Sequence, residues 1–148
     1  MAELTHLERR RIQMEYVIPL IRDLQELLGK DAVNSALAER ARRLEQSASC
    51  EKPVDFALMP EMAKVYAEGN ALEYEVIASD ADRFDIDVHH CRYAEMIDEL
   101  GGRDVGHLLL CNLDFAEARR LGMRLERTRT RMQGASVCDF RYRPIGKD

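Results

Sequence analysis

The sequence contains no stretch approaching the roughly 18 consecutive apolar residues that a membrane-spanning helix needs. Its N-terminus, from Met1 to Thr5, also lacks the apolar core of a secretory signal and runs directly into charged residues. We therefore expect a cytoplasmic protein that has no membrane partner. Cysteines in that compartment are usually reduced thiols. The chain has four of them, Cys50, Cys91, Cys111 and Cys138.

Familiar cofactor and metal motifs are missing as well. There is no Walker loop, no G-x-G-x-x-G, no G-x-S-x-G and no H-E-x-x-H. Tight C-x2-C or H-x3-H pairs are absent too, so a zinc site would have to use widely spaced ligands. The net charge of −5 argues against general nucleic-acid binding. We expect no cofactor, no metal and no nucleic-acid partner, although a metal site of scattered ligands stays open.

The composition is that of one globular domain. The chain has 148 residues, of which 46% are hydrophobic and 33% charged, and this length is enough to bury a core. We expect a single domain over residues 1–148, with a helical part at 1–70 and a sheet-containing part at 71–148. From Arg119 onward basic residues outnumber acids, and this local positive charge suits a small anionic ligand.

The first part of the chain predicts helices. Thr5 and Glu8 form a capping box ahead of a helix over residues 7–28, in which Pro19 should cause a kink or an interruption. A second helix should follow, capped by Asp31, and Pro60 suits the first turn of a short third one. The apolar stripe of the first helix predicts either a homodimer interface or a face that covers the sheet. It consists of Met14, Ile18, Ile21 and Leu24.

The second part changes to strand periodicity. Apolar and polar residues alternate over 72–76 and 84–88, which predicts a first hairpin. Helices should follow at 91–100 and 105–121, and a second hairpin should pair 123–132 with 137–143. Two hairpins can join into one antiparallel sheet of about four strands. The predicted class is therefore α+β, with the N-terminal and central helices covering one face.

Thiols and carboxylates gather in this second part. Cys111 and Asp114 are three residues apart on a predicted helix and are therefore neighbours on one side. Cys111 alone would more often be a small core residue, but a carboxylate bordering the same stripe needs a partner or a function. Asp114 is expected either to act chemically or to pair with an arginine.

Two further groups of residues are candidates. Cys91 ends a strand and begins a helix, where a thiol pKa is usually lowered, and it follows His89 and His90, which are exposed polar residues in the plain interpretation. A two-residue turn at residues 134–135 would place Thr130 opposite Asp139, on one face with Thr128, although an ordinary polar sheet face would look the same.

Several motifs, in order, resemble those of the L-2-amino-thiazoline-4-carboxylic acid hydrolase family. They are residues 84–94 (Phe-Asp-Ile-Asp-Val-His-His-Cys-Arg-Tyr-Ala), the C-x-x-D of residues 111–114, the Arg-Thr-Arg-Thr of residues 127–130, and Gly134 followed by Cys-Asp-Phe-Arg-Tyr at 138–142. The motifs span residues 84–142, and the N-terminal helices are compatible with the family but less specific.

The resemblance implies hydrolytic opening of a cyclic isothiourea to N-carbamoyl-L-cysteine. Asp114 would then be a general base, or a thiolate at Cys111 or Cys91 would attack first. A histidine or Asp139 would protonate the departing group, and Arg127 would bind the substrate carboxylate. The complete set of site residues implied is Cys91, Cys111, Asp114, Cys138 and Asp139 for catalysis, and His89, His90, Arg127, Thr128 and Thr130 for substrate binding.

Two other classes stay open from sequence. An α+β shell with two hairpins can enclose a ligand without catalysing anything. The cysteines could instead serve a thiol-based redox or metal sensor. Bound ligand without turnover would favour the former, and bound metal or a cysteine–cysteine linkage the latter.

Overall fold

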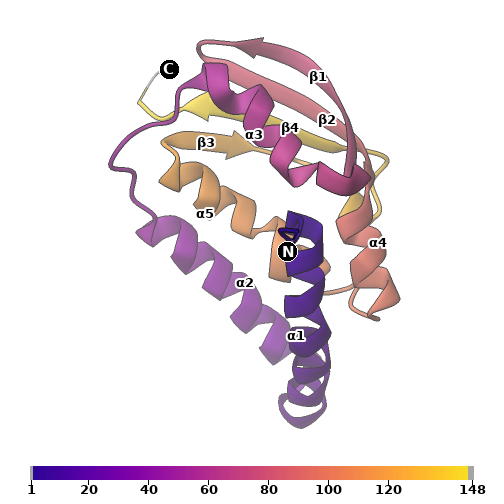
Figure 1. The fold of residues 1–148 in the computed structure, drawn as a ribbon. Helices are drawn as coiled ribbons and strands as arrows, with labels where there is room; N and C mark the ends of the chain where they lie inside the picture. The colour runs from indigo at the N-terminus through magenta and orange to yellow at the C-terminus, as the bar shows by residue number, and fades with distance from the viewer. Residues whose placement is uncertain (1, 147–148) are drawn as a thin grey trace.

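The computed structural model describes residues 2–146 and confirms the α+β class. Its four strands are β1 (Leu72–Asp80), β2 (Arg83–Cys91), β3 (Met123–Glu126) and β4 (Cys138–Pro144). They form one sheet in the order β1-β2-β4-β3, with every neighbouring pair antiparallel. Strand β1 pairs with β2 and β3 with β4, and the two pairs meet along β2 and β4 (Figure 1).

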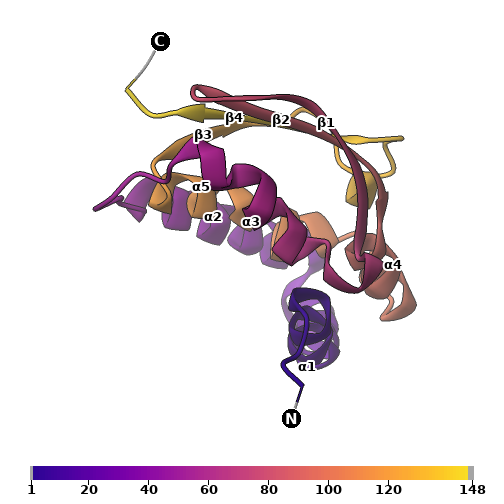
Figure 2. The same cartoon turned by 45° about the horizontal axis from the view of Figure 1, so that its top comes forward.

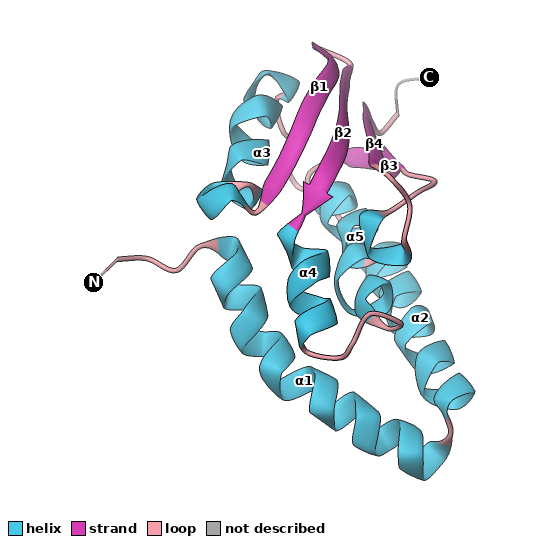
Figure 3. Cartoon of the chain, turned by 90° about the vertical axis from the view of Figure 1, so that its right-hand side faces the viewer, coloured by secondary structure: helices cyan, strands magenta, loops and turns pink. Residues whose placement is uncertain are grey.

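The helices gather on one side of this sheet. They are α1 (His6–Leu28), α2 (Lys30–Ser47), α3 (Met59–Tyr66), α4 (Arg92–Glu99) and α5 (Leu113–Arg120). Figure 2 shows the curved sheet arching over α3, α5 and α2, with α1 beyond them. Figure 3 shows α4 continuing directly from the end of β2, and α1 and α2 joined as a long V.

The first helix begins as predicted, because Thr5 and Glu8 form the capping box. The predicted interruption of α1 and the predicted cap of α2 are wrong, while a kink at Pro19 stays a prediction. Pro19 does not interrupt α1, since its exposed position leaves the missing hydrogen bond on the solvent side of the helix. Asp31 does not cap α2, because Gly29 already occupies the N-cap position with a positive φ of 93°.

The apolar stripe of α1 is used inside the chain. Met14 and Ile18 pack in a cluster with residues of α4, and Ile21 packs with Val33 and Val105. The stripe therefore covers α4 and the residues near Val105 rather than the sheet. This packing removes the surface on which the homodimer prediction rested, and the homodimer stays a prediction that sedimentation must test.

The predicted helix over 105–121 is two elements rather than one. Residues His107–Cys111 form a π-helix, and α5 begins only at Leu113. π-Helical turns are rare and occur frequently at functional sites, because the wider turn re-aims the side chains that follow it. Here the wide turn ends at Cys111.

The second hairpin has a different register and turn from those predicted. Leu125 pairs with Tyr142 and Glu126 with Arg141, so Thr128, not Thr130, comes opposite Asp139. The expected two-residue turn is wrong because Thr130 caps a short 3-10 helix at Arg131–Gln133 by accepting a hydrogen bond from the Gln133 amide. This helix adds residues to the connection and ends β3 early.

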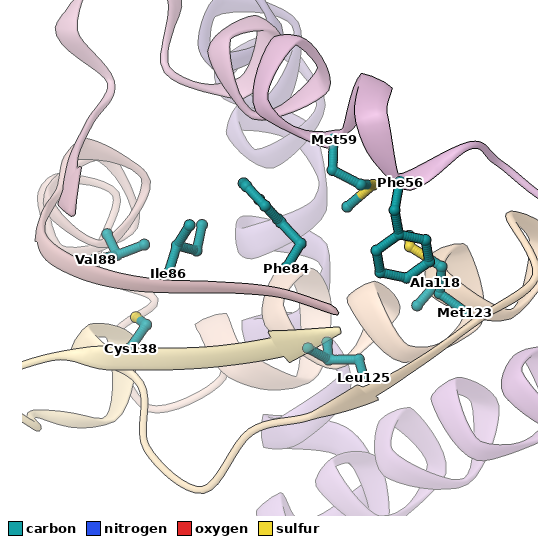
Figure 4. Close-up of a cluster of buried hydrophobic side chains, with 9 residues drawn as sticks. All are labelled: Phe56, Met59, Phe84, Ile86, Val88, Ala118, Met123, Leu125 and Cys138. Carbon is teal, nitrogen blue, oxygen red and sulfur yellow. The ribbon is translucent and has the colours of Figure 1, made fainter. Parts of the chain in front are cut away.

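The largest core cluster lies between the sheet and the helices (Figure 4). Phe84, Ile86 and Val88 alternate along β2 and point to the same side. Val88 is paired with Cys138 across the β2–β4 ladder. This inner face of the sheet forms one wall of the site that follows.

Candidate active site

A cavity of about 550 Å³ lies between the inner face of the sheet and helices α1, α3 and α5. That volume is within the range of small-molecule sites, which are mostly apolar with a few placed polar groups. The apolar wall includes Met59, Phe84, Ile86, Val88 and Phe140. The polar and ionisable lining residues are His6, Arg10, Arg40, Tyr66, Tyr74, Cys91, Tyr93, Cys111, Asp114, Glu117, Arg120, Arg127, Thr130, Cys138 and Tyr142.

Three of the four cysteines line this cavity. Cys91 comes from the end of β2, Cys111 from the end of the π-helix and Cys138 from the start of β4. Cys50 lies elsewhere, with its sulfur against Gly122 near Pro53. All four are free thiols.

The cavity thiols are held in their neutral form. Burial raises the pKa of Cys91 to about 11, and the nearby Cys138 contributes to the rise. Burial also raises the pKa of Cys111 well above that of an ordinary thiol, and it raises the pKa of Cys138. The expectation that the helix start would lower the Cys91 pKa is therefore wrong, because hydrogen bonds from the Tyr93 and Ala94 amides are weaker than the loss of solvent.

Asp114 and Arg127 form an ion pair at the cavity wall. Arg127 Nη1 donates to Asp114 Oδ2 over 2.7 Å, and Nη2 donates to the Cys111 carbonyl oxygen over 2.9 Å. The guanidinium also lies over the Phe115 ring, 5.0 Å from its centroid, and over the Phe140 ring at 5.1 Å. The Arg127 side chain is only 3% exposed, so these contacts fix both its position and its orientation.

The Asp114 side chain keeps 41% of its accessible area although it lies deep in the fold. We attribute this area to the cavity that Asp114 lines. Burial raises the pKa of Asp114, while the charge and hydrogen bond of Arg127 act in the opposite direction. The result is a carboxyl group that faces the cavity, held by one fixed arginine and more basic than an ordinary aspartate.

Asp139 and Thr128 lie outside the cavity lining and fasten the segment that carries Arg127. Asp139 accepts hydrogen bonds from the Thr128 hydroxyl and from the amides of Thr128 and Arg129. Desolvation acts to raise the pKa of Asp139, but these hydrogen bonds outweigh it and the pKa is lowered. Thr130, in contrast, is buried and lines the cavity.

The two neighbouring histidines are not brought to the cavity. His89 is exposed and lies 3.6 Å from a Glu75 carboxylate oxygen, and His90 lies 2.9 Å from one of Glu95. Neither lines the cavity. Both histidines therefore lie at the surface, in agreement with their interpretation from the sequence as exposed polar residues.

A different histidine does line the cavity, and the sequence interpretation missed it. His6 Nδ1 lies 2.9 Å from the Tyr93 hydroxyl, which donates to the Tyr66 carbonyl oxygen over 2.9 Å. Since Tyr93 has only one proton to donate, His6 donates from Nδ1 and keeps Nε2 as an acceptor when neutral. Burial lowers the His6 pKa and favours that neutral form.

The missed residues had a signal in the sequence. His6 and Arg10 precede Met14 and Ile18 at intervals of four, so they continue the buried stripe of α1 toward its N-terminus. Polar residues on a stripe that is otherwise buried are candidates for a lined cavity.

Within residues 2–146, no group of three or more His, Cys, Asp and Glu side chains is placed to hold a metal ion. No helix in that same range combines the length and the apolar character needed to cross a membrane.

The family model described as L-2-amino-thiazoline-4-carboxylic acid hydrolase matches residues 9–142 of this chain. A search of curated proteins gives no match. The matched span contains every residue predicted for the site from the sequence.

Proposed function

This chain belongs to the L-2-amino-thiazoline-4-carboxylic acid hydrolase family, and we propose that it hydrolyses a cyclic isothiourea bearing a carboxylate. The observation that carries the proposal is the Asp114 carboxyl group, which lines the cavity and is fixed by Arg127. The family is one of hydrolases, and hydrolysis needs a base that can activate water.

The reaction can be written with this one carboxyl group. Asp114 takes a proton from a water molecule as its oxygen adds to the ring carbon between nitrogen and sulfur. Asp114 passes that proton to the ring nitrogen, whose double bond to the carbon opened in the addition. The bond between the carbon and sulfur then breaks as the added hydroxyl becomes the carbonyl, and Asp114 carries the hydroxyl proton to the sulfur. The product is an N-carbamoyl amino acid with a free thiol. A raised pKa suits both steps, because it makes the carboxylate a better base and keeps the acid form accessible.

The alternative route, in which a cysteine attacks first, has less support. The thiolate is the nucleophile, and burial keeps Cys91, Cys111 and Cys138 as neutral thiols. The nearby Asp114 carboxyl group adds to the rise in the pKa of each of them, so it opposes thiolate formation further. We therefore favour direct attack by water and give the three thiols the role of a compact, weakly polar wall near the reacting carbon.

Arg127 acts in this proposal as a positioning residue. Its hydrogen bonds to Asp114 and to the Cys111 carbonyl oxygen tie the carboxyl group to the turn that precedes α5. The Asp139 hydrogen bonds hold the Arg127 segment in turn. The family motifs around Arg127 and Asp139 thus support the base rather than contact the substrate.

The test is ring opening of the thiazoline acid, followed through release of the product thiol. Asp114→Asn should lower turnover by about 10²–10⁴-fold, which is the usual contribution of a positioned base. Asp87→Asn is the matched control. Asp87 forms an ion pair with Arg141 at 2.8 Å in the same sheet, and its strand position alternates with the inward Ile86 and Val88.

The control variant should lose some stability and keep its turnover. If folded Asp114→Asn turns over at the wild-type rate, Asp114 is not the base. If the wild-type protein binds the thiazoline acid without opening it, the site is that of a ligand-binding module.

A further inference from the structure

We propose that Arg10, near the start of α1, binds the carboxylate of the ligand in this cavity. Arg127 would be the obvious residue for this task by its place in the family motif. The inference rests on the proposed function only for the choice of ligand, a heterocycle that carries a carboxylate. It makes Arg10 the residue that selects acids over neutral rings.

Arg127 is poorly suited to bind a second carboxylate. It already has Asp114 as a counter-ion at 2.7 Å and the Cys111 carbonyl oxygen at 2.9 Å. The Phe115 and Phe140 rings lie on the guanidinium, and its side chain is almost entirely buried. A substrate carboxylate placed there would compete with Asp114 for the same cation and would have its own charge beside that of Asp114.

Arg10 has the opposite properties. It lines the cavity and is half-buried, and its one side-chain hydrogen bond goes from Nη1 to Gln13 Oε1 over 2.9 Å. Within residues 2–146 Arg10 has no carboxylate partner. Arg11 and Arg22 on α1 and Arg42 on α2, in contrast, each form an ion pair with a carboxylate. A partly desolvated guanidinium that has N–H groups without an acceptor binds a carboxylate strongly.

The other arginines at the cavity are weaker candidates. Arg120 is exposed and already bonded to Glu117 at 3.1 Å. Arg40 is exposed on α2, so water screens its charge. Among the arginines that line the cavity, only Arg10 combines partial burial with the lack of a carboxylate partner within residues 2–146.

Arg10 and Asp114 line the same cavity, Arg10 from α1 and Asp114 from α5. Burial raises the pKa of Asp114, and the charge of Arg10 is among the contributions that oppose this rise, so Arg10 lies within electrostatic reach of the carboxyl group. Arg10 and Asp114 nevertheless come from different helices and are not in contact. In the thiazoline acid, the carboxylate and the reacting carbon lie on either side of the ring nitrogen. A ligand held by Arg10 can therefore present that carbon to Asp114.

The experiment compares two probes and two adjacent arginines. The probes are the thiazoline acid and the same 2-amino-thiazoline ring without the carboxylate, and their dissociation constants are measured by titration calorimetry. Arg10→Gln should weaken binding of the acid by about 10- to 100-fold, the value of a charged hydrogen bond, and leave the neutral ring nearly unchanged. Arg9→Gln is the control, because Arg9 is exposed and does not line the cavity.

Arg9→Gln should change neither constant. Unchanged affinity of folded Arg10→Gln for the acid would overturn the inference, and so would an equal loss for both probes. If Arg10→Gln fails to fold, Arg10→Lys is measured instead. Lysine keeps the positive charge but lacks the planar guanidinium. The ratio of the dissociation constants for the neutral ring and the acid should therefore fall several-fold in Arg10→Lys, and an unchanged ratio overturns the inference. Acid-selective binding without ring opening would leave the inference intact and refute the proposed hydrolysis.

Discussion

Arg127 Nη1 lies 2.7 Å from Asp114 Oδ2, and the arginine side chain in this pair is almost fully buried while the aspartate faces the cavity. A guanidinium in that position cannot be solvated by water if its counter-ion is lost. The pair therefore links stability to activity. In the proposed mechanism its two members carry different functions, since Asp114 would contact the ligand and Arg127 contacts mainly protein.

Replacing the arginine tests this division. Arg127→Gln removes an almost fully buried guanidinium, and losing a hydrogen bond to a charged group typically costs about 1.5–3 kcal/mol. The free energy of unfolding from urea titration should fall by about that amount. Arg141→Gln is the control, because Arg141 and Asp87 are both partly exposed and should cost about 1 kcal/mol or less. Equal losses in the two variants would show that burial of Arg127 does not govern the effect.

The pH dependence of ring opening follows from Asp114. Burial raises the pKa of Asp114, and the base must be deprotonated to act. The acidic limb of the kcat/KM profile, along which the rate rises with pH, should therefore lie at higher pH than it would for an ordinary aspartate. Arg127 lowers that pKa, so Arg127→Gln should shift the limb to higher pH. An unchanged limb in this variant would mean that another group controls the profile.

The same carboxyl group has a signature in stability. Because its pKa is raised by folding, the folded state holds the proton more tightly than the unfolded state does. The stabilisation that Asp114 gives through this shift is therefore fully present below its pKa in the unfolded state, and it is lost as pH rises through its pKa in the folded state. The difference in unfolding free energy between wild type and Asp114→Asn, followed against pH, should show this trend. A difference that grows in favour of wild type with rising pH would have the wrong sign.

Cys111→Ser separates the two chemical routes. If water attacks directly, the variant should keep turnover within about tenfold, since Asp114 and Arg127 are unchanged. A hydroxyl group placed in the surroundings of Cys111 should cost about 1–3 kcal/mol if it lacks a partner. A loss of more than about 10³-fold in a folded variant would instead favour attack by the Cys111 thiolate. Mass spectrometry of stopped reactions, looking for a covalent adduct in the wild type, gives an independent answer.

The first hairpin was predictable because its signals are local. Phe84, Ile86 and Val88 alternate with polar residues, and this pattern fixed both the strand and its inward face. The π-helix was not predictable. Leu108, Leu109 and Leu110 form a continuous apolar run, which suits an α-helix equally well.

The site was predictable only in part, for a related reason. Cys91, Cys111, Asp114 and Cys138 were found through motifs, and the fold brings them to one cavity. The cavity's N-terminal wall depends on how α1 packs on the rest of the chain. His6 and Tyr93 meet across 87 positions of sequence, and no local pattern encodes that contact.

Thiol labelling tests the cavity without any assay of turnover. Cys91, Cys111 and Cys138 line it and have raised pKa values, so each forms little thiolate near neutral pH. Cys50 lies apart beside Gly122, and we expect it to react first with a maleimide reagent in the native protein. Peptide mapping identifies the labelled residue, and Cys50→Ser should remove the fast phase. Bound thiazoline acid should slow the three cavity cysteines further and leave the Cys50 rate unchanged. If Cys50 is the slowest to label, or if the ligand protects it and not the others, the ligand does not bind in this cavity.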